Sequence, residues 1–360
     1  MAKEKRKKKQ YTSIGGQALI EGIMMRGPGH SSISVRHTNG EIITEYLEAA
    51  SLRDRYPILK LPLLRGVAAF IESLMVGFKA LTKSMELSGL ADLEEDDDEE
   101  PSKFETWITN TFGDKLFGVL TGIATVLAVI LGVGLFFFVP SLLFNGIQSL
   151  VGADISGWRA LFEGVLKIVI FLTYVILISQ MKEIRRVFEY HGAEHKTIFC
   201  FEANEELTVE NVRKQRRFHP RCGTSFLLTM LLVGILVSYI LAATTTLDDN
   251  IWLWTPVKIL LVPVIMALGF ECIKLAGKYD NLFTRIIAAP GLWMQRITTK
   301  EPHDDQIEVA IMALKAVLPG GEAYLTKKPE EDAASEEDGS ALREDPAPQA
   351  PVSPQEEAVQ

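Results

Sequence analysis

Two long uncharged runs constrain the fold of this 360-residue chain more than any other feature. Residues 116–139 hold no charged side chain over 24 positions, and residues 223–247 hold none over 25. A helix rises about 1.5 Å per residue, so each run can cross about 30 Å of hydrocarbon. Residues 161–181 and 251–270 are comparable, but each carries a lysine, Lys167 or Lys258, that we expect to extend to the lipid headgroups. The sequence therefore predicts four transmembrane helices.

The distribution of charge predicts how these helices are oriented. The formal charge of −9 comes from two acidic runs, residues 92–100 and the tail from residue 330, and the rest of the chain is basic. Residues 182–221 hold nine lysines and arginines, whereas the predicted turns at 142–160 and 245–250 hold one and none. By the positive-inside rule, this basic segment and both termini are cytoplasmic. We expect a multi-pass protein of the plasma membrane that contacts anionic lipid headgroups and binds no nucleic acid.

The segments outside the predicted spans differ in composition. Residues 31–37 and 41–47 alternate as strands around Asn39-Gly40, which is a strong hairpin signal. The amphipathic stretch that follows carries too many charges for a span, so we expect it to lie in the membrane interface. The predicted fold is an α-helical polytopic membrane protein. Before the membrane domain we expect a basic tail (1–12), a small β-rich cytoplasmic unit (13–58), an interfacial amphipathic helix (59–91) and an acidic linker (92–103). Then follow a four-helix transmembrane domain (104–272) with a cytoplasmic loop (182–222), a cytoplasmic interfacial segment and helix (273–318) and a disordered acidic tail (319–360).

The stretch YHGAEHK, residues 190–196, follows the second predicted span and its basic flank. On a helix, His191 and His195 project from one face, and Glu194 lies beside them. Two imidazoles at this spacing can hold one divalent metal, and the order H-x-x-E-H is that of the inverzincins, in which a glutamate serves as general base. We therefore predict that His191 and His195 bind metal and that Glu194 is the catalytic base.

A second motif, FHPRCGTS at residues 218–225, directly precedes the third predicted span. It places His219 and Cys222 at a helix N-terminus, where the helix dipole stabilises a thiolate. Spans two and three end on the same side of the membrane, so we expect His219 and Cys222 to join the two histidines as ligands. Imidazole and thiolate suit zinc, and three protein ligands leave a position for water or substrate.

Three further residues are predicted to contact substrate. The glycine-rich residues 15–29 predict either a turn framework or a substrate loop that offers Glu21 and Arg26, and Arg221 lies between the two proposed ligands of the second motif. A downstream carboxylate ligand, which inverzincins have, is not identified by its spacing, and the candidates are Glu202, Glu205, Glu271 and Asp280.

Four blocks of the sequence, GGQALIEGIMMRGP, YHGAEHK, HPRCGTSF and PGLWMQRITTKEP, resemble in the same order the signature blocks of the YqhQ-like family of bacterial membrane proteins. The resemblance covers roughly residues 13–318 without the acidic linker. That family is functionally uncharacterised and carries a label of predicted metal-dependent enzyme. The resemblance implies a polytopic membrane protein with cytoplasmic soluble parts.

The sequence leaves several functions open. A metal-dependent hydrolase is the first, because water activated at a metal is the simplest chemistry for these residues. A lipid- or anion-handling protein is the second, favoured by the basic face and by Pro256 and Pro263 in the fourth span. A non-catalytic scaffold or assembly factor is the third. Cys222 could also act as a nucleophile with His219, although no orienting acid is evident, and residues 191–195 could form only a polar cluster at headgroup level.

Overall fold

The computed structural model describes residues 14–47, 52–90, 115–220, 222–245, 247, 250–278 and 281–326. The predicted basic tail, the acidic linker and residues 327–360 lie outside this part of the chain, and so do Arg221 and Asp280.

An antiparallel sheet begins the described chain, which confirms the predicted β-rich unit. Its four strands pair in the order of the sequence: β1 (Gly15–Leu19), β2 (Gly22–Arg26), β3 (Ser31–Arg36) and β4 (Ile42–Leu47). Gly40 adopts a φ of 92° in the turn between β3 and β4, as the Asn39-Gly40 signal requires. The β1–β2 turn depends on Glu21, whose φ is 51°.

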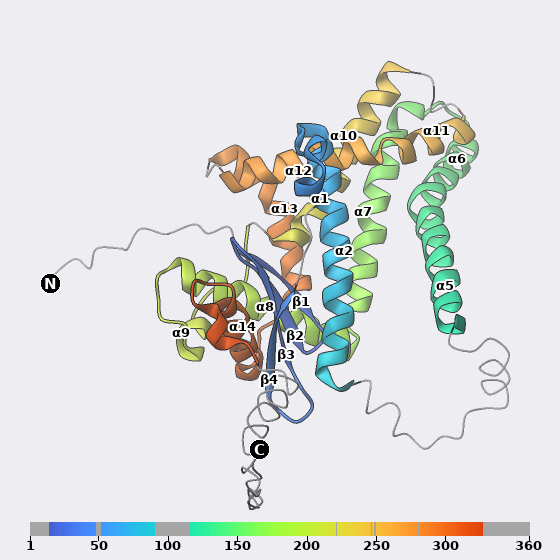
Figure 1. Cartoon of the computed structure of the whole chain (residues 1–360). Helices are drawn as coiled ribbons and strands as arrows, with labels where there is room; N and C mark the ends of the chain where they lie inside the picture. The colour runs from blue at the N-terminus through green and yellow to red at the C-terminus, as the bar shows by residue number, and fades with distance from the viewer. Residues whose placement is uncertain are drawn as a thin grey trace, which may run out of the picture.

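Helices cover both faces of the sheet (Figure 1). On one face, Leu19, Ile33 and Val35 pack against α2 (Pro62–Ser88). On the other face, Ile23 and Met25 share a core with α8 (Lys182–Glu202) and α14 (Asp304–Ala316). Since both faces are buried, β2 and β3 have nearly continuous burial instead of the alternation of a one-sided sheet. The sheet therefore joins helices from three distant parts of the sequence.

Three helical stretches of the described residues are long and apolar enough to cross a membrane, and a bent pair makes a fourth candidate. The three are Gly122–Val151, Ser156–Ile178 and Phe226–Thr244. The first stretch is built from α5 (Lys115–Val133), the π-helical turn η2 (Gly134–Phe138) and α6 (Val139–Val151). The second consists of η3 (Ser156–Trp158) and α7 (Arg159–Ile178), and the third belongs to α10 (Gly223–Thr244). All four candidates overlap predicted spans, but the first continues through α6 to Val151, into residues that the sequence predicted as a turn.

The fourth candidate consists of α11 (Ile251–Leu260) and α12 (Val262–Lys278), which meet at an angle of 44°. Pro263 follows the break directly, and its ring nitrogen has no hydrogen to donate to the preceding turn. The structure therefore has a bend beside Pro263, where the sequence predicted a helix interrupted by proline.

Lys258 does not extend outward from its helix, contrary to the expectation from sequence. Its side chain is 2% exposed, and its Nζ lies 2.5 Å from the carboxylate of Glu163 on α7. Ser141 and the indole of Trp254 also donate to Glu163. Lys258 turns inward because the buried carboxylate of Glu163, across the helix interface, offers its ammonium group a partner inside the protein.

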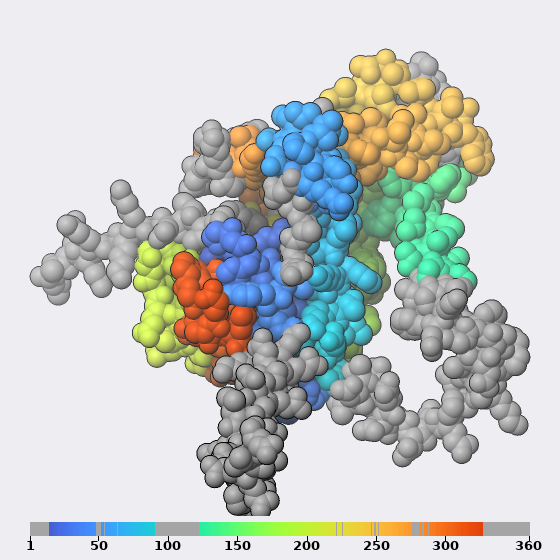
Figure 2. Space-filling view, in the orientation of Figure 1, coloured from blue at the N-terminus to red at the C-terminus, as the bar shows by residue number. Residues whose placement is uncertain are grey.

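The sheet, α8, α9 (Val209–Arg213) and α14 form a compact body that we call the sheet lobe (Figures 1 and 2). A break at residues 179–181 separates α7 from α8, so the H-x-x-E-H motif lies on a helix of its own. The long α13 (Leu282–Thr298) packs along α10 and leads back from α12 to this lobe. The remaining short elements are α1 (Leu52–Arg55), η1 (Pro57–Lys60) and η5 (Gly321–Tyr324).

Candidate functional site

Three of the predicted ligands converge where the sheet lobe meets α10. The donor atoms of His191, His195 and Cys222 all lie within 4.8 Å of one another, and all three residues are buried. The Nε2 atom of His191 is 3.1 Å from the Sγ atom of Cys222, and the two imidazole centroids are 4.4 Å apart. The histidines are one turn apart on α8, and Cys222 is the residue that caps the N-terminus of α10.

Main-chain carbonyl groups fix the orientation of both imidazoles. His191 Nδ1 lies 2.9 Å from the carbonyl oxygen of Thr298, and His195 Nδ1 lies 2.5 Å from that of Arg217. A carbonyl can only accept a hydrogen bond, so each Nδ1 is the protonated nitrogen and each Nε2 is directed to the cluster. The Nε2 of His195 is buried and has no hydrogen-bond partner among the described residues. Such carbonyl-anchored imidazoles are typical of metal-binding histidines.

The electrostatics of the cluster favour a charged thiolate. Burial alone would raise the pKa of the Cys222 thiol, but the positive charges of His191 and His195 lower it well below its ordinary value. Burial alone would lower the pKa of His191, but the charge and the hydrogen bond of Cys222 outweigh burial and raise that pKa to about 9. The position at the N-terminus of α10 adds the partial positive charge of a helix dipole.

The three donor atoms suit a transition metal such as zinc. Zinc binds imidazole at about 2.0–2.1 Å and thiolate at about 2.3 Å with tetrahedral angles, which places nitrogen and sulfur about 3.5 Å apart. The 3.1 Å between His191 Nε2 and Cys222 Sγ is slightly shorter than this separation. A modest side-chain movement would therefore accommodate the ion, and the partnerless Nε2 of His195 would gain a ligand.

Glu194 lies on α8 beside the cluster and faces the β1–β2 hairpin. Its Oε1 accepts a hydrogen bond of 3.1 Å from the main-chain N–H of Gly16, while its Oε2 is buried without a partner among the described residues. Burial raises the pKa of this carboxyl, and the charges of His191 and His195 reduce the rise. A carboxyl with a raised pKa and one unengaged oxygen is suited to accept a proton near neutral pH.

The buried Lys196 helps to hold the segment whose Arg217 carbonyl group orients His195. Lys196 is 4% exposed, forms an ion pair with Glu301 and donates to the carbonyl oxygen of Arg213. Glu301 in turn pairs with the guanidinium of Arg217 at 3.2 Å. These contacts hold residues 213–217 against α8, so they set the position of the Arg217 carbonyl group.

Close approach on the other side of α8 depends on a glycine. A Cβ atom at Gly192 would lie 2.0 Å from the carbonyl oxygen of Lys300. The N–H of Lys300 also donates to the carbonyl of Phe188 at 2.8 Å. Only glycine allows α8 and residues 298–302 to come this close, and this contact brings the Thr298 carbonyl to His191.

His219 lies beside the three-residue cluster, and its ring is not one of the converging donors found among the described residues. Its ring centroid is 5.4 Å from that of His195 and 4.8 Å from that of Phe199. Its main-chain N–H donates to the side-chain oxygen of Gln295 at 2.7 Å, and the amide of Gln295 donates back to its carbonyl at 2.8 Å. The thiol of Cys222 lies against His191 Nε2, whereas Cys222 meets His219 through the main chain, where its N–H donates to the His219 carbonyl oxygen at 3.4 Å.

Glu21 and Arg26, which were predicted to contact substrate, do not belong to the group of converging donor residues. Glu21 forms an ion pair with Arg186 and accepts a hydrogen bond of 3.1 Å from Tyr190, so it connects the β1–β2 turn to α8. Arg26 is exposed at the end of β2, opposite Gly15 in the strand register. Among the described carboxylate candidates, Glu205 accepts from Gln215, Glu271 pairs with Arg65, and Glu202 is buried on α8; none of them belongs to the converging group.

Several residues that build the site have no signal of their own in the sequence. Thr298 and Arg217 act through carbonyl groups, which every residue type offers, and Gly16 acts through its N–H group. Gln295 could have been suspected, since it belongs to the PGLWMQRITTKEP block, but its partner His219 lies 76 positions away.

Comparison with known proteins places the cluster inside a matched region. Residues 61–320 match the family described as "Protein of unknown function (DUF1385)". The chain is 36% identical over 313 residues to the protein described as "Uncharacterized protein YqhQ" of Bacillus subtilis (strain 168), and the alignment covers 87% of this chain and 94% of that relative. No solved structure matches the chain.

Proposed function

We propose that this chain, which belongs to the DUF1385 family of YqhQ-like proteins, is a metal-dependent membrane hydrolase whose site faces the cytoplasm. His191, His195 and Cys222 hold the metal, and Glu194 is the general base. The observation that carries the proposal is the convergence of three buried donor atoms within 4.8 Å, with both imidazoles anchored through Nδ1. A bound zinc ion would lower the pKa of a water molecule and polarise a carbonyl or phosphoryl oxygen.

Glu194 performs the proton transfers in this proposal. Its carboxylate accepts a proton from the attacking water, whose oxygen forms a bond to the substrate carbonyl carbon or phosphorus. The protonated carboxyl then donates that proton to the departing oxygen as the substrate bond breaks. The Gly16 N–H group holds one carboxylate oxygen, so the unengaged Oε2 is the atom that exchanges the proton.

The membrane location rests on the long apolar helices and on the basic residues around the site. Three helices and one bent pair are suited to span a membrane, and large apolar side chains are exposed along them, including Leu131, Leu177 and Leu260. The lysine and arginine content of residues 182–221 supports a cytoplasmic position for the sheet lobe and both termini, next to anionic lipid headgroups.

A lipid- or anion-handling protein is the second candidate, because the helices enclose a cavity lined by Glu163, Lys167 and Lys258. In that function the arginines near the site, Arg213, Arg216 and Arg217, would matter more than Glu194. Two of these arginines already have carboxylate partners, Arg213 with Asp304 and Arg217 with Glu301. No observation in the described part of the chain specifically favours a scaffold.

The experiment that tests the proposed function separates metal binding from hydrolysis. Full-length protein is purified in a nonionic detergent with zinc supplied, its metal content is measured, and hydrolysis of a 4-nitrophenyl ester and a 4-nitrophenyl phosphate is assayed. We expect Glu194→Gln to keep the metal and to lower kcat at least about 100-fold. The exposed Glu183 of the same helix provides the control Glu183→Gln, which should match the wild type. Equal activity of Glu194→Gln and wild type would contradict the proposal.

A further inference from the structure

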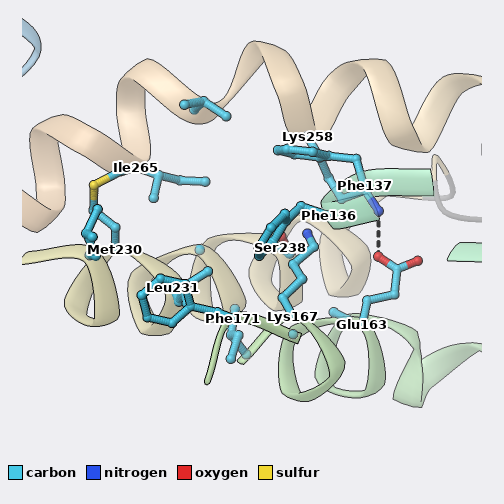
Figure 3. Close-up of a pocket in the computed structure, with 16 residues that line it drawn as sticks. Phe136, Phe137, Glu163, Lys167, Phe171, Met230, Leu231, Ser238, Lys258 and Ile265 are labelled. Carbon is cyan, nitrogen blue, oxygen red and sulfur yellow. Dashed lines mark hydrogen bonds and ion pairs between the residues drawn. The ribbon is translucent and has the colours of Figure 1, made fainter. Parts of the chain in front are cut away.

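A cavity of about 300 Å³ lies among the apolar helices, apart from the metal cluster. Its walls come from α7, α10 and the bent pair α11–α12, and the π-helical turn η2 contributes Phe136 and Phe137 (Figure 3). The lining residues of α10 extend from Leu227 to Ser238, and those of α7 from Ala160 to Phe171. Eleven residues of helix correspond to about 16 Å, so the cavity is elongated along both helices.

Most of the wall is apolar, but three ionisable side chains point into the cavity. Glu163 and Lys258 form a buried ion pair, with 2% of each side chain exposed. Lys167, one turn beyond Glu163 on α7, also enters the cavity and does not extend to the headgroups as the sequence led us to expect (Figure 3). The carboxylate of Glu163 therefore neutralises Lys258, and the ammonium group of Lys167 gives the cavity one positive charge in excess.

Lys167 has no carboxylate partner in the part of the chain that the structure describes. Its Nζ lies 4.8 Å from the ring centroid of Phe137, which offers only the weak attraction of an aromatic face. Lys167 is partly buried, and an ammonium group without a counter-ion is costly in an apolar environment. A negatively charged group bound in the cavity would remove this cost.

The turn η2 is the second feature that indicates a ligand. Residues Gly134–Phe138 form five positions of π-helix between two α-helices, and two of its three phenylalanines line the cavity. A π-helical turn lacks the compact hydrogen bonding of an α-helix, and such turns occur frequently at functional sites. Here the turn directs two aromatic rings and a cation–π contact to one cavity.

We propose that this cavity binds a single-chain anionic amphiphile, a medium-chain carboxylate of about eight carbons, with its headgroup on Lys167 and its chain along the apolar walls of α7 and α10. The volume corresponds to about ten atoms of methylene size, if each takes about the 30 Å³ of a liquid water, which is one chain and not two. The apolar walls disfavour a small hydrated anion, and the excess positive charge repels an amine and attracts a carboxylate more strongly than a neutral alcohol. This inference does not depend on the metal site.

The test uses photolabelling of the full-length protein in a nonionic detergent. The probe is an octanoate with a diazirine on its chain, and the matched probes are the corresponding octanol and octylamine. We expect the carboxylate probe to label peptides of α7 and α10 and to be displaced by unlabelled octanoate. The alcohol and amine probes should need at least about tenfold higher concentration, because a charge-assisted hydrogen bond is lost.

Two variants locate the site. Lys167→Met should raise the half-saturating concentration of the carboxylate probe at least about tenfold, whereas Lys182→Met, at an exposed lysine, should leave it unchanged. Gly234→Leu should block labelling by filling the cavity, because a Cβ atom at Gly234 meets Ile265 only at an ordinary contact distance of 3.7 Å. Wild-type binding by both Lys167→Met and Gly234→Leu, equal labelling by the alcohol, or labels confined to outward-facing residues would each overturn the proposal.

Discussion

Gly16 connects the N-terminal hairpin to the candidate base at the scale of single residues. Its N–H group is the hydrogen-bond donor to Glu194 Oε1, and a Cβ atom at this position would lie 3.0 Å from Glu194 Cδ and 2.6 Å from the Met24 carbonyl oxygen. Any larger residue must therefore displace the carboxylate or the strand. The neighbouring Gly15 has no atom within 4 Å of such a Cβ, which makes it a matched control.

We predict that Gly16→Ala lowers the rate of ester or phosphate hydrolysis about tenfold or more while the metal content stays unchanged. A hydrogen bond to a charged group contributes about 1.5–3 kcal/mol, which corresponds to this factor. Gly15→Ala should retain wild-type kcat. Loss of the metal together with activity in Gly16→Ala would contradict this prediction, because it would show that β1 supports the metal ligands and not Glu194.

Gly192 controls how closely α8 approaches residues 298–302. Alanine in a helix is ordinarily more stable than glycine by about 1 kcal/mol. At Gly192 its Cβ would lie 2.0 Å from the Lys300 carbonyl oxygen, so we predict that Gly192→Ala destabilises the protein by about 1–3 kcal/mol. Thermal unfolding in detergent would measure this loss. Gly146→Ala, at a helical glycine with open space, should not lower the melting temperature; equal melting temperatures for the two variants would contradict the prediction.

Between elements, the Glu163–Lys258 pair joins α7 to α11. Removing one partner leaves a buried charge uncompensated, so we predict that Glu163→Leu or Lys258→Met costs about 3–5 kcal/mol of unfolding free energy. The double variant should lose less than the sum of the two single losses, because neither member of the pair is then left without the other; Arg159, 4.0 Å from Glu163, loses its carboxylate in every variant that lacks Glu163. As a control, Glu210→Gln removes a fully exposed pair with Lys214 and should leave the free energy of unfolding unchanged, because water screens this pair. Additive losses in the double variant would show that the pair is not coupled.

The elements differ in how well the sequence predicts them. The β3–β4 hairpin follows from Asn39-Gly40, and each candidate span follows from an uncharged or nearly uncharged run, because these signals are local. The inward direction of Lys258 could not be predicted, since it depends on Glu163, 95 positions away. Spacing on one helix predicted His191 and His195, and the predicted membrane topology led us to expect Cys222 beside them. The carbonyl groups of Thr298 and Arg217 carry no residue-type signal, so the anchoring of the imidazoles became visible only in the structure.

For the whole molecule, the proposed orientation puts the sheet lobe in the cytoplasm and the turn between α6 and α7 on the opposite side. Exposed positions on each side allow a direct test: Asn39→Cys in the β3–β4 turn and Ala153→Cys between α6 and η3. In intact spheroplasts, we predict that a membrane-impermeant maleimide labels Ala153→Cys and not Asn39→Cys. Inside-out vesicles should give the reverse pattern. Labelling of both positions from one side would contradict the four-span arrangement.

The metal centre is the central claim, and zinc K-edge X-ray absorption of the full-length protein purified with zinc tests it most directly. We predict near-stoichiometric zinc with one sulfur at about 2.3 Å and two imidazole nitrogens at about 2.0–2.1 Å. The sulfur contribution should disappear in Cys222→Ser and persist in Cys272→Ser, whose cysteine lies on α12 outside the cluster. Failure to retain zinc, or a coordination shell of oxygen and nitrogen without sulfur in the wild type, would contradict the proposed centre.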